Sequence, residues 1–418
     1  MFKIFVNSWK VKEIRNKMLY TLLILAIVRL GAHIYLPGIS ATTIKAYTDL
    51  YSTGTLYNII AGGAGSGYSI FALGIGPYIT ASIIMQLLCV AIPYLEQLSK
   101  EGEDGRKKIN KYTRYITVVL AALQGIGIVL NYRTMMTNPS ALYVIVGVIT
   151  LVAGSVFIMW LAEQITAKGI SNGSSMIIFV NIISSLPQAI SALVSYGQEG
   201  TTGILKVVGI LVLLLIVIIL IVKVNDGERR LPVQYSSKMA GRRVGGGSST
   251  FPIKVNTAGV ISIIFAISLL QFPETISGFI SAKPGWLQTV IEVLRMTHPI
   301  GAVLYVILIF FFSYFYTSIV INPNEIAENL KKNGGFIPGI RPGQPTANYI
   351  TRVVERITLV GAVCFSVLAL VPIVMQWIFK VNVGFGGTTL IIVVGVCLDI
   401  VKALESQLLM RHYKGFLD

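Results

Sequence analysis

Ten apolar segments, each close to the length of a membrane-spanning helix, recur along the chain and constrain its fold more than any other feature. A helix needs ~20 predominantly apolar residues to cross the hydrocarbon of a bilayer. The segments cover residues 18–36, 70–92, 115–130, 141–161, 175–194, 204–224, 257–272, 301–321, 357–379 and 388–404. Since 54% of the residues are hydrophobic and only 12% are charged, the sequence predicts an all-α polytopic membrane protein with ten transmembrane helices.

The second apolar segment is interrupted by residues that weaken helices. It carries no charge, but it contains Gly74, Gly76 and Pro77, and a glycine cluster at 62–67 precedes it. A backbone group freed by such a break finds no water in hydrocarbon, so the break is tolerated only against protein or a water-filled cavity. We therefore expect this segment to line a pathway.

The positions of Lys and Arg predict the orientation, because positive residues in short loops stay on the cytoplasmic side. Most of the 34 lie in the first 17 residues, in loops 93–114, 162–173, 223–254 and 323–356, and in the tail from residue 402. The opposite loops hold only Lys45, Arg133, Lys206, Lys283, Arg295 and Lys380. Both termini are therefore predicted to be cytoplasmic. Orientation explains most of the net charge of +16, and the alternative for the remainder is a contact surface for an acidic or RNA-bearing partner.

Catalytic and metal-binding patterns are missing from the sequence. The cysteines lie singly in apolar segments and the histidines are far apart: Cys89, Cys364, Cys397, His33, His298 and His412. The glycine cluster lacks the lysine and the preceding strand of a nucleotide-binding loop. We expect no catalytic residues, no metal site and no cofactor, and hence no enzyme.

Charged residues are almost absent from the middle of the apolar segments. Ion-coupled carriers usually place Asp, Glu, Lys or Arg there, because these residues bind the coupling ion. Arg29, Glu163 and Asp399 lie toward segment ends and are interpreted as structural. A small-solute carrier and an intramembrane enzyme remain the alternative functions, and the sequence favours neither.

Seven long motifs, in order from about residue 10 to the tail, carry a family resemblance. They are GIGPYITASIIMQLL, EGEDGRKKINKYTRY, LAEQITAKGISNG, ERRLPVQYSSKMAGRR, FPIKVNTAGVI, NPNEIAENLKKNGGFIPGIRPGQPTANYI and FGGTTLIIVV. The chain closely resembles the SecY family, the channel subunits of the bacterial protein translocase. Within that family, GIRPG points to the bacterial branch.

The resemblance implies two inverted five-helix halves, here 1–200 and 201–418, with a pore between them. A short plug helix, about 56–65, would close the pore on the outside; its core is Leu56, Tyr57, Asn58, Ile59, Ile60, Ala61, Gly62 and Gly63. This segment is too short to span the membrane, and composition alone would favour a solvent-exposed outer loop. A ring of aliphatic side chains would narrow the pore at mid-membrane: Ile75, Ile79, Ile178, Ile264 and Ile392. Without the motifs, these would be ordinary core or lipid-facing isoleucines.

The resemblance also implies a lateral gate and two docking loops. The gate would lie between the second and third spans on one side and the seventh and eighth on the other, with polar positions Gln86, Gln124, Asn256 and Thr257. Loops 223–254 and 322–356 would dock a motor or the ribosome, chiefly through Arg341. Supporting candidates are Arg229, Arg230, Arg242, Arg243, Lys331 and Lys332, for which membrane orientation alone is the alternative explanation.

The function that the resemblance implies is a protein-conducting channel in the bacterial plasma membrane. Such a channel translocates unfolded secretory polypeptides and releases transmembrane segments laterally into lipid. The expected partners are the SecE and SecG subunits, the SecA motor, the ribosome, signal sequences, the unfolded substrates and membrane lipid.

Overall fold

The computed structural model describes residues 2–38, 69–131, 140–198, 200–235, 248–255, 260–277, 285–296, 298–379 and 387–414. The expected plug at 56–65 lies outside the described residues, as do Arg242, Arg243, Asn256 and Thr257.

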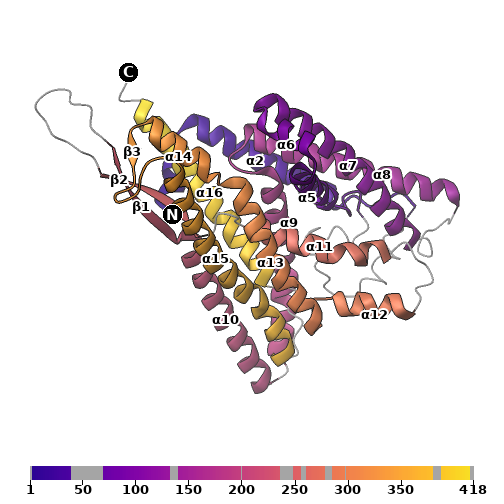
Figure 1. The fold of residues 1–418 in the computed structure, drawn as a ribbon. Helices are drawn as coiled ribbons and strands as arrows, with labels where there is room; N and C mark the ends of the chain where they lie inside the picture. Colours follow the sequence, from indigo (N-terminus) through magenta and orange to yellow (C-terminus); the bar gives the residue numbers. More distant parts are fainter. Residues whose placement is uncertain are drawn as a thin grey trace, which may run out of the picture.

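The fold is a bundle of long helices with a small sheet at one end (Figure 1). In the first 200 residues the helices are α1 (Phe2–Lys10), α2 (Lys12–Gly31), α5 (Gly76–Ala91), α6 (Pro93–Lys100), α7 (Glu103–Asn131), α8 (Ala141–Lys168) and α9 (Gly173–Gly197). The later helices are α10 (Thr201–Asp226), α11 (Ile261–Ser277), α12 (Gly285–Leu294), α13 (Pro299–Val320), α14 (Pro323–Lys332), α15 (Gln344–Phe379) and α16 (Gly387–Lys414). The strands are β1 (Glu228–Tyr235), β2 (Ser248–Lys254) and β3 (Gly335–Phe336).

Each of the ten predicted segments coincides with one helix: α2, α5, α7, α8, α9, α10, α11, α13, α15 and α16. Their bounds differ in places; α2, for example, ends at Gly31, before the predicted end at residue 36. Among the described residues, six helices are long and apolar enough to span a membrane by themselves, or seven if a bent pair is counted as one span. The difference from ten arises because α5 and α11 are short and because α2 and α16 carry charges at one end. The fold is an all-α polytopic membrane protein.

The second segment is interrupted at its start, as the sequence predicts, whereas the bent pair lies at its other end. Helix α5 begins only at Gly76, with Pro77 in its first turn, after Gly74 adopts a φ of 55° that favours glycine. At the other end, α5 and α6 meet at an angle of 103°. Ile92 between them is extended, because the following Pro93 disfavours helical geometry in the residue before it.

The N-terminal segment is also divided. The mixture of apolar and basic residues in FKIFVNSWKVKEIRNK predicts a helix that lies at the membrane interface, and the structure has a helix, α1, over residues 2–10 of this segment. Val11 is extended, and residues from Lys12 onward belong to α2. Helix α1 packs against α16.

The sheet is a feature that the sequence analysis did not predict. Its strand order is β2-β1-β3, all antiparallel, with Leu231 opposite Phe251 and Gln234 opposite Phe336. Below it lies a hydrophobic cluster of Leu231, Ile253, Ile337, Ile350 and Val354. The sheet therefore joins loops 223–254 and 322–356 into one unit.

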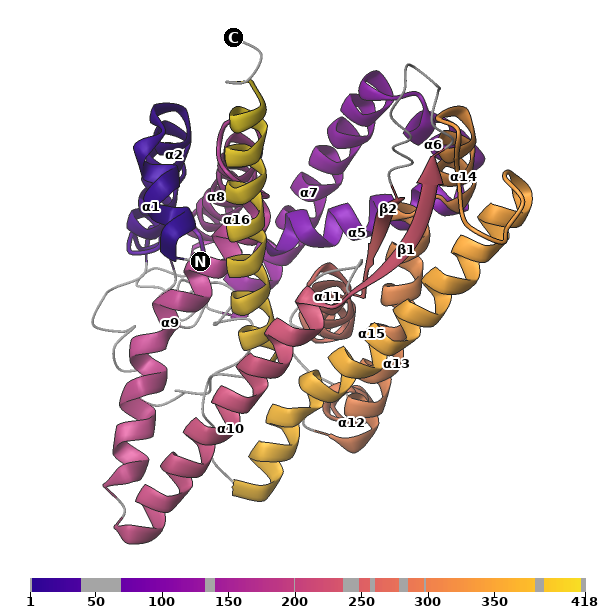
Figure 2. The ribbon, with the colours of Figure 1, turned by 90° about the vertical axis from the view of Figure 1, so that its left-hand side faces the viewer.

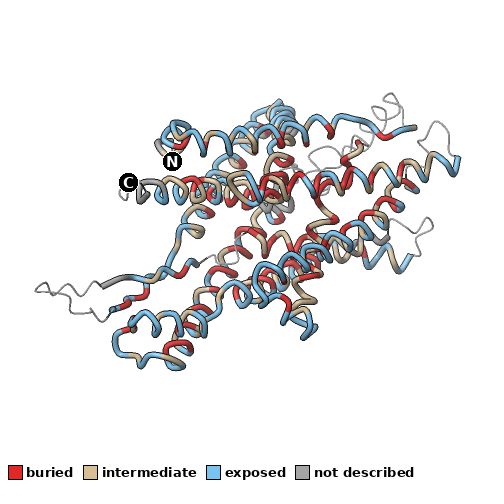
Figure 3. The backbone as a smooth tube through the Cα atoms, turned by 90° about the horizontal axis from the view of Figure 1, so that it is seen from above, coloured by how far each residue is buried: buried red, intermediate tan, exposed pale blue. Residues whose placement is uncertain are grey.

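The sheet, α1 and the end of α16 lie at the same end of the molecule (Figures 1 and 3). This arrangement agrees with the prediction that both termini share a side with the positively charged loops. Figure 3 shows buried residues in the interior and exposed residues on the outer faces. The outward side chains of α10 are apolar, such as Leu205 at 76% and Leu215 at 59% exposed, which suits a surface that contacts lipid.

Candidate functional site

The five predicted ring isoleucines all lie in or against one large buried hydrophobic cluster. Ile75, Ile79, Ile178 and Ile392 are 1%, 8%, 2% and 3% exposed, and they belong to one buried hydrophobic cluster. Ile264 is half-buried and packs against the same cluster. The five residues come from four helices, α5, α9, α11 and α16, so helices from both halves of the chain meet at this point.

Local helix geometry explains how these side chains reach the centre. Ile75 is the N-cap residue of α5, and its carbonyl accepts the N–H of Ile79 at 3.1 Å, so the two lie one turn apart on the same face. On α11, the N–H of Ile264 donates to Val260 O at 3.1 Å, which places Ile264 in the first turn of that helix. Helix α11 packs against α5, and α16 packs against α9.

The buried interior is uncharged. Among the described residues, its buried polar groups are those of serines, threonines, Asn181 and the hydroxyl of Tyr305. The part of the chain covered by the structure also holds no group of three or more His, Cys, Asp or Glu suited to a metal ion. A narrow passage lined by aliphatic side chains can exclude ions because water leaves it. The isoleucine cluster has the side chains that such a seal requires.

The predicted lateral seam is a contact between the two halves in this structure. Helix α11 packs against α5, α7 and α13, and Figure 2 shows it between α5 and the α13–α15 pair. Phe265 of α11 meets Phe312 of α13 edge to face, with ring centroids 5.6 Å apart. Gln86 and Gln124 are half-buried. The amide of Gln86 donates to Ser82 Oγ of its own helix at 3.2 Å, so this bond lies within α5 rather than across the seam.

Arg341 is exposed in a tight loop after β3. Gly339 and Gly343 flank it with φ values of 81° and 103°, a backbone conformation that residues other than glycine rarely adopt. Thr346 Oγ1 donates to Arg341 O at 2.9 Å and fixes the loop to the start of α15. The GIRPG motif therefore holds the arginine outward with a defined backbone.

The other docking candidates differ in how free their charges are. Arg230 forms an ion pair with Glu228 at 2.6 Å, and Lys332 forms one with Glu328 at 2.9 Å. The hydrogen bond from Lys332 lowers the pKa of the Glu328 carboxyl. Within the described residues, Arg229 and Lys331 are exposed and have no ion-pair partner. Arg242 and Arg243 lie outside those residues.

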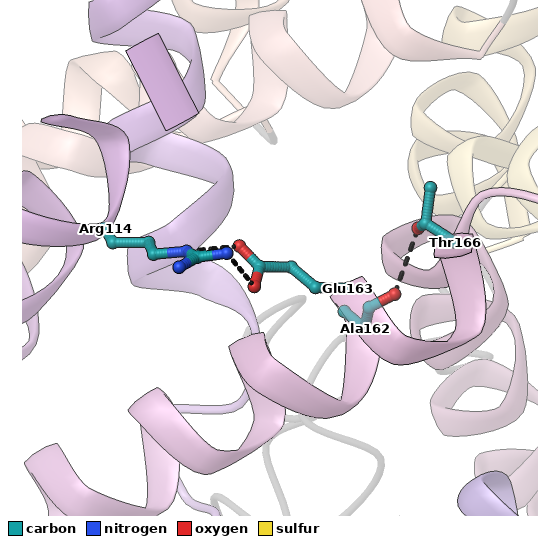
Figure 4. Close-up of polar contacts among 4 residues, drawn as sticks. All are labelled: Arg114, Ala162, Glu163 and Thr166. Carbon is teal, nitrogen blue, oxygen red and sulfur yellow. Dashed lines mark hydrogen bonds and ion pairs between the residues drawn. The ribbon is translucent and has the colours of Figure 1, made fainter. Parts of the chain in front are cut away.

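Sequence reasoning missed an ion pair that joins α7 to α8. Arg114 of α7 donates to Glu163 of α8 through Nε at 2.8 Å and Nη2 at 2.7 Å (Figure 4). Nearby on α8, Thr166 Oγ1 donates to Ala162 O at 3.0 Å and accepts the N–H of Gly173 at 2.9 Å. The residues lie in two of the quoted motifs, but nothing in either motif indicates that they pair.

Comparisons with known proteins agree with this architecture. The SecY family profile matches residues 69–401. The protein translocase subunit SecY of Aquifex aeolicus (strain VF5) is 44% identical over 425 residues, which cover 98% of each chain. The protein translocase subunit SecY of Halalkalibacterium halodurans is 43% identical over 430 residues, with all of each chain covered.

Solved structures share the fold at low sequence identity. One, described as "The structure of a protein conducting channel", has a TM-score of 0.68 and 18% identity, covering 93% of this chain and 91% of that chain. Another, "Sec61 in the Canine ribosome-channel complex from the endoplasmic reticulum", has a TM-score of 0.65 and 17% identity, covering 93% and 91%. Together with the full-length identity to the bacterial proteins and the family profile, the fold shows that this chain belongs to the SecY family.

Proposed function

We propose that the chain forms the protein-conducting channel of a bacterial translocase, through which unfolded secretory polypeptides cross the plasma membrane. The observation that carries the proposal is the isoleucine cluster, in which Ile75, Ile79, Ile178 and Ile392 from three helices are buried together and Ile264 from a fourth packs on them. Membership of a family whose bacterial relatives are named protein translocase subunits supports it.

In this proposal the cluster seals the pore around the passing polypeptide. Aliphatic walls offer a passing polypeptide no hydrogen bonds, so they bind none of its backbone groups and can slide along side chains of any sequence. When no polypeptide is present, the same walls pack together and exclude water and ions. The segment at 56–65 would act as the plug on the outer side, and residues 1–200 and 201–418 would be the two halves that part.

Lateral release uses the seam between α5 and α11. An apolar signal sequence gains roughly 25 cal/mol per Å² of surface that it transfers from water to lipid. A ligand shifts a two-state equilibrium only when it binds one state better, so the signal sequence must bind the parted seam better than the closed one. Gln86 and Gln124, with Asn256 and Thr257, would line the parted seam.

The cytoplasmic sheet would be the docking platform for the SecA motor and the ribosome, with Arg341 as the chief contact. A guanidinium pairs with carboxylate or phosphate in a fixed geometry, and the flanking glycines present this one outward. Arg229 and Lys331 are the next candidates. Arg230, Lys332, Arg242 and Arg243 would contribute as supporting charges, and SecE and SecG would pack against the membrane-facing helices.

Reconstitution of the purified chain with SecE and SecG into liposomes tests this function. After SecA, ATP and a secretory precursor are added outside, the precursor should become resistant to protease until detergent is added. A small-solute carrier or an intramembrane protease would leave the precursor accessible or would cleave it. Protection that does not depend on the chain would contradict the proposal.

A further inference from the structure

Two buried glycines hold the chain where the cytoplasmic sheet connects to α11. Val255, directly after β2, and Val260, directly before α11, bracket residues 256–259, which lie outside the described part. Gly361 of α15 lies against Val255: a β-carbon there would be 2.6 Å from the Val255 carbonyl oxygen. Gly395 of α16 lies against Val260, and a β-carbon there would overlap with Val260 Cγ2.

Val255 is fixed from a second side as well. Its N–H donates to Gly227 O at 2.8 Å, at the point where α10 ends. Lys402 of α16 reaches the same end of α10, with Nζ 3.3 Å from Asn225 O and 3.1 Å from Asp226 Oδ1. The base of the sheet is therefore attached to α10, α15 and α16 just before the chain enters α11.

The contact between Val260 and Gly395 lies one helical turn from two ring isoleucines. Ile264 follows Val260 by four residues, and its N–H donates to Val260 O. Ile392 precedes Gly395 by three residues on α16. With 3.6 residues per turn, both isoleucines lie about one turn from the contact. Helix α11 leads away from the sheet, and α16 runs toward the end of the molecule where the sheet lies. Ile264 and Ile392 therefore lie farther from the sheet than the contact does, toward the membrane interior.

We propose that Gly395 is a positioning residue that sets the distance between the start of α11 and α16, and hence between Ile264 and Ile392. Val260 is 6% exposed and belongs to the same buried cluster as the ring, so a larger residue at 395 cannot be accommodated by turning Val260 toward solvent. The start of α11 must move away from α16, and Ile264 moves with it. This inference rests on the proposed channel function, because it assigns the consequence to the constriction.

Gly395→Ala tests the proposal in proteoliposomes that contain the full complex. We expect its resting ion conductance, measured without SecA or precursor, to rise about tenfold, which corresponds to about 1.4 kcal/mol in favour of the open state. Val260→Ala combined with Gly395→Ala removes the overlapping methyl groups and should restore the wild-type conductance.

Gly197→Ala is the matched control, since a β-carbon at Gly197, the last residue of α9, meets no atom within 4 Å. It should conduct like the wild type. If Gly395→Ala does not accumulate in the membrane, Val260→Ile enlarges the other side of the same contact and should produce the same leak.

Wild-type conductance in Gly395→Ala, or a leak that Val260→Ala does not reduce, would overturn the positioning role. The proposed function is read separately, from precursor protection by the wild-type channel in the same liposomes. Failure there with intact glycines would count against the channel and not against the contact.

Discussion

Replacing Ile392 by asparagine places an amide inside the isoleucine cluster. Ile392 is 3% exposed and surrounded by apolar side chains, so the amide would have no partner while the cluster is closed. An unpaired buried amide costs about 1–3 kcal/mol. Opening of the passage admits water and removes most of this cost, so the closed state alone is destabilised.

The expected shift in the closed–open equilibrium is therefore about 5–150-fold toward the open state. Ion conductance of proteoliposomes without precursor measures it directly. In cells, the same variant should export precursors whose signal sequences are too weak for the wild type. Both effects have one cause, a lower free energy of opening.

Ile391→Asn is the control for general damage to the core. Ile391 is the neighbouring residue on α16, is 0% exposed and belongs to the same cluster, but it points about 100° away around the helix. It should destabilise the fold to a similar degree without the same leak. Equal leaks from both variants, or none from Ile392→Asn, would refute the assignment of the ring.

Three further outcomes concern the Arg341 loop and the Arg114–Glu163 ion pair. Arg341→Glu should leave membrane insertion and topology intact while abolishing SecA-driven precursor protection; transport at the wild-type rate would remove Arg341 from the docking surface. Gly343→Ala puts a side chain on a residue with a φ of 103°, which costs about 1 kcal/mol. The affinity for SecA should therefore fall although every charge remains. Unchanged affinity would contradict the role of this loop in presenting Arg341. Glu163→Gln removes the ion pair with Arg114, whose side chain is half exposed. The free energy of unfolding should therefore fall by no more than about 1 kcal/mol. A larger loss would mean that the pair does more than join α7 to α8.

The helices were predictable because hydrocarbon imposes a length and a composition on any segment that crosses it. The interruption before α5 was predictable too, because Gly74 and Pro77 act locally. The isoleucines were chosen by motif, and the structure places all five in or against one buried cluster, without testing whether they form a ring. Their role in conduction remains a prediction.

The sheet was missed because its strands depend on contacts distant in sequence. β1 does show alternation, with Leu231 and Val233 buried between exposed neighbours, and this period of two could have indicated a strand. β3 is only two residues long, and its pairing with Gln234 and Tyr235 has no local signal. The Arg114–Glu163 pair and the two glycine contacts at Val255 and Val260 likewise depend on how helices pack, which a single sequence does not specify.

If the translocating polypeptide passes through the isoleucine cluster, disulfide capture of an arrested precursor will detect it there. Cys89, Cys364 and Cys397 are first replaced by serine, and one cysteine is introduced at Ile178 or, as a membrane-facing control on α10, at Leu215. A precursor arrested midway by a folded domain and carrying a single cysteine within the membrane should cross-link to position 178 and not to position 215. Cross-linking at 215 alone, with none at 178 in channels shown to hold the arrested chain, would contradict the account.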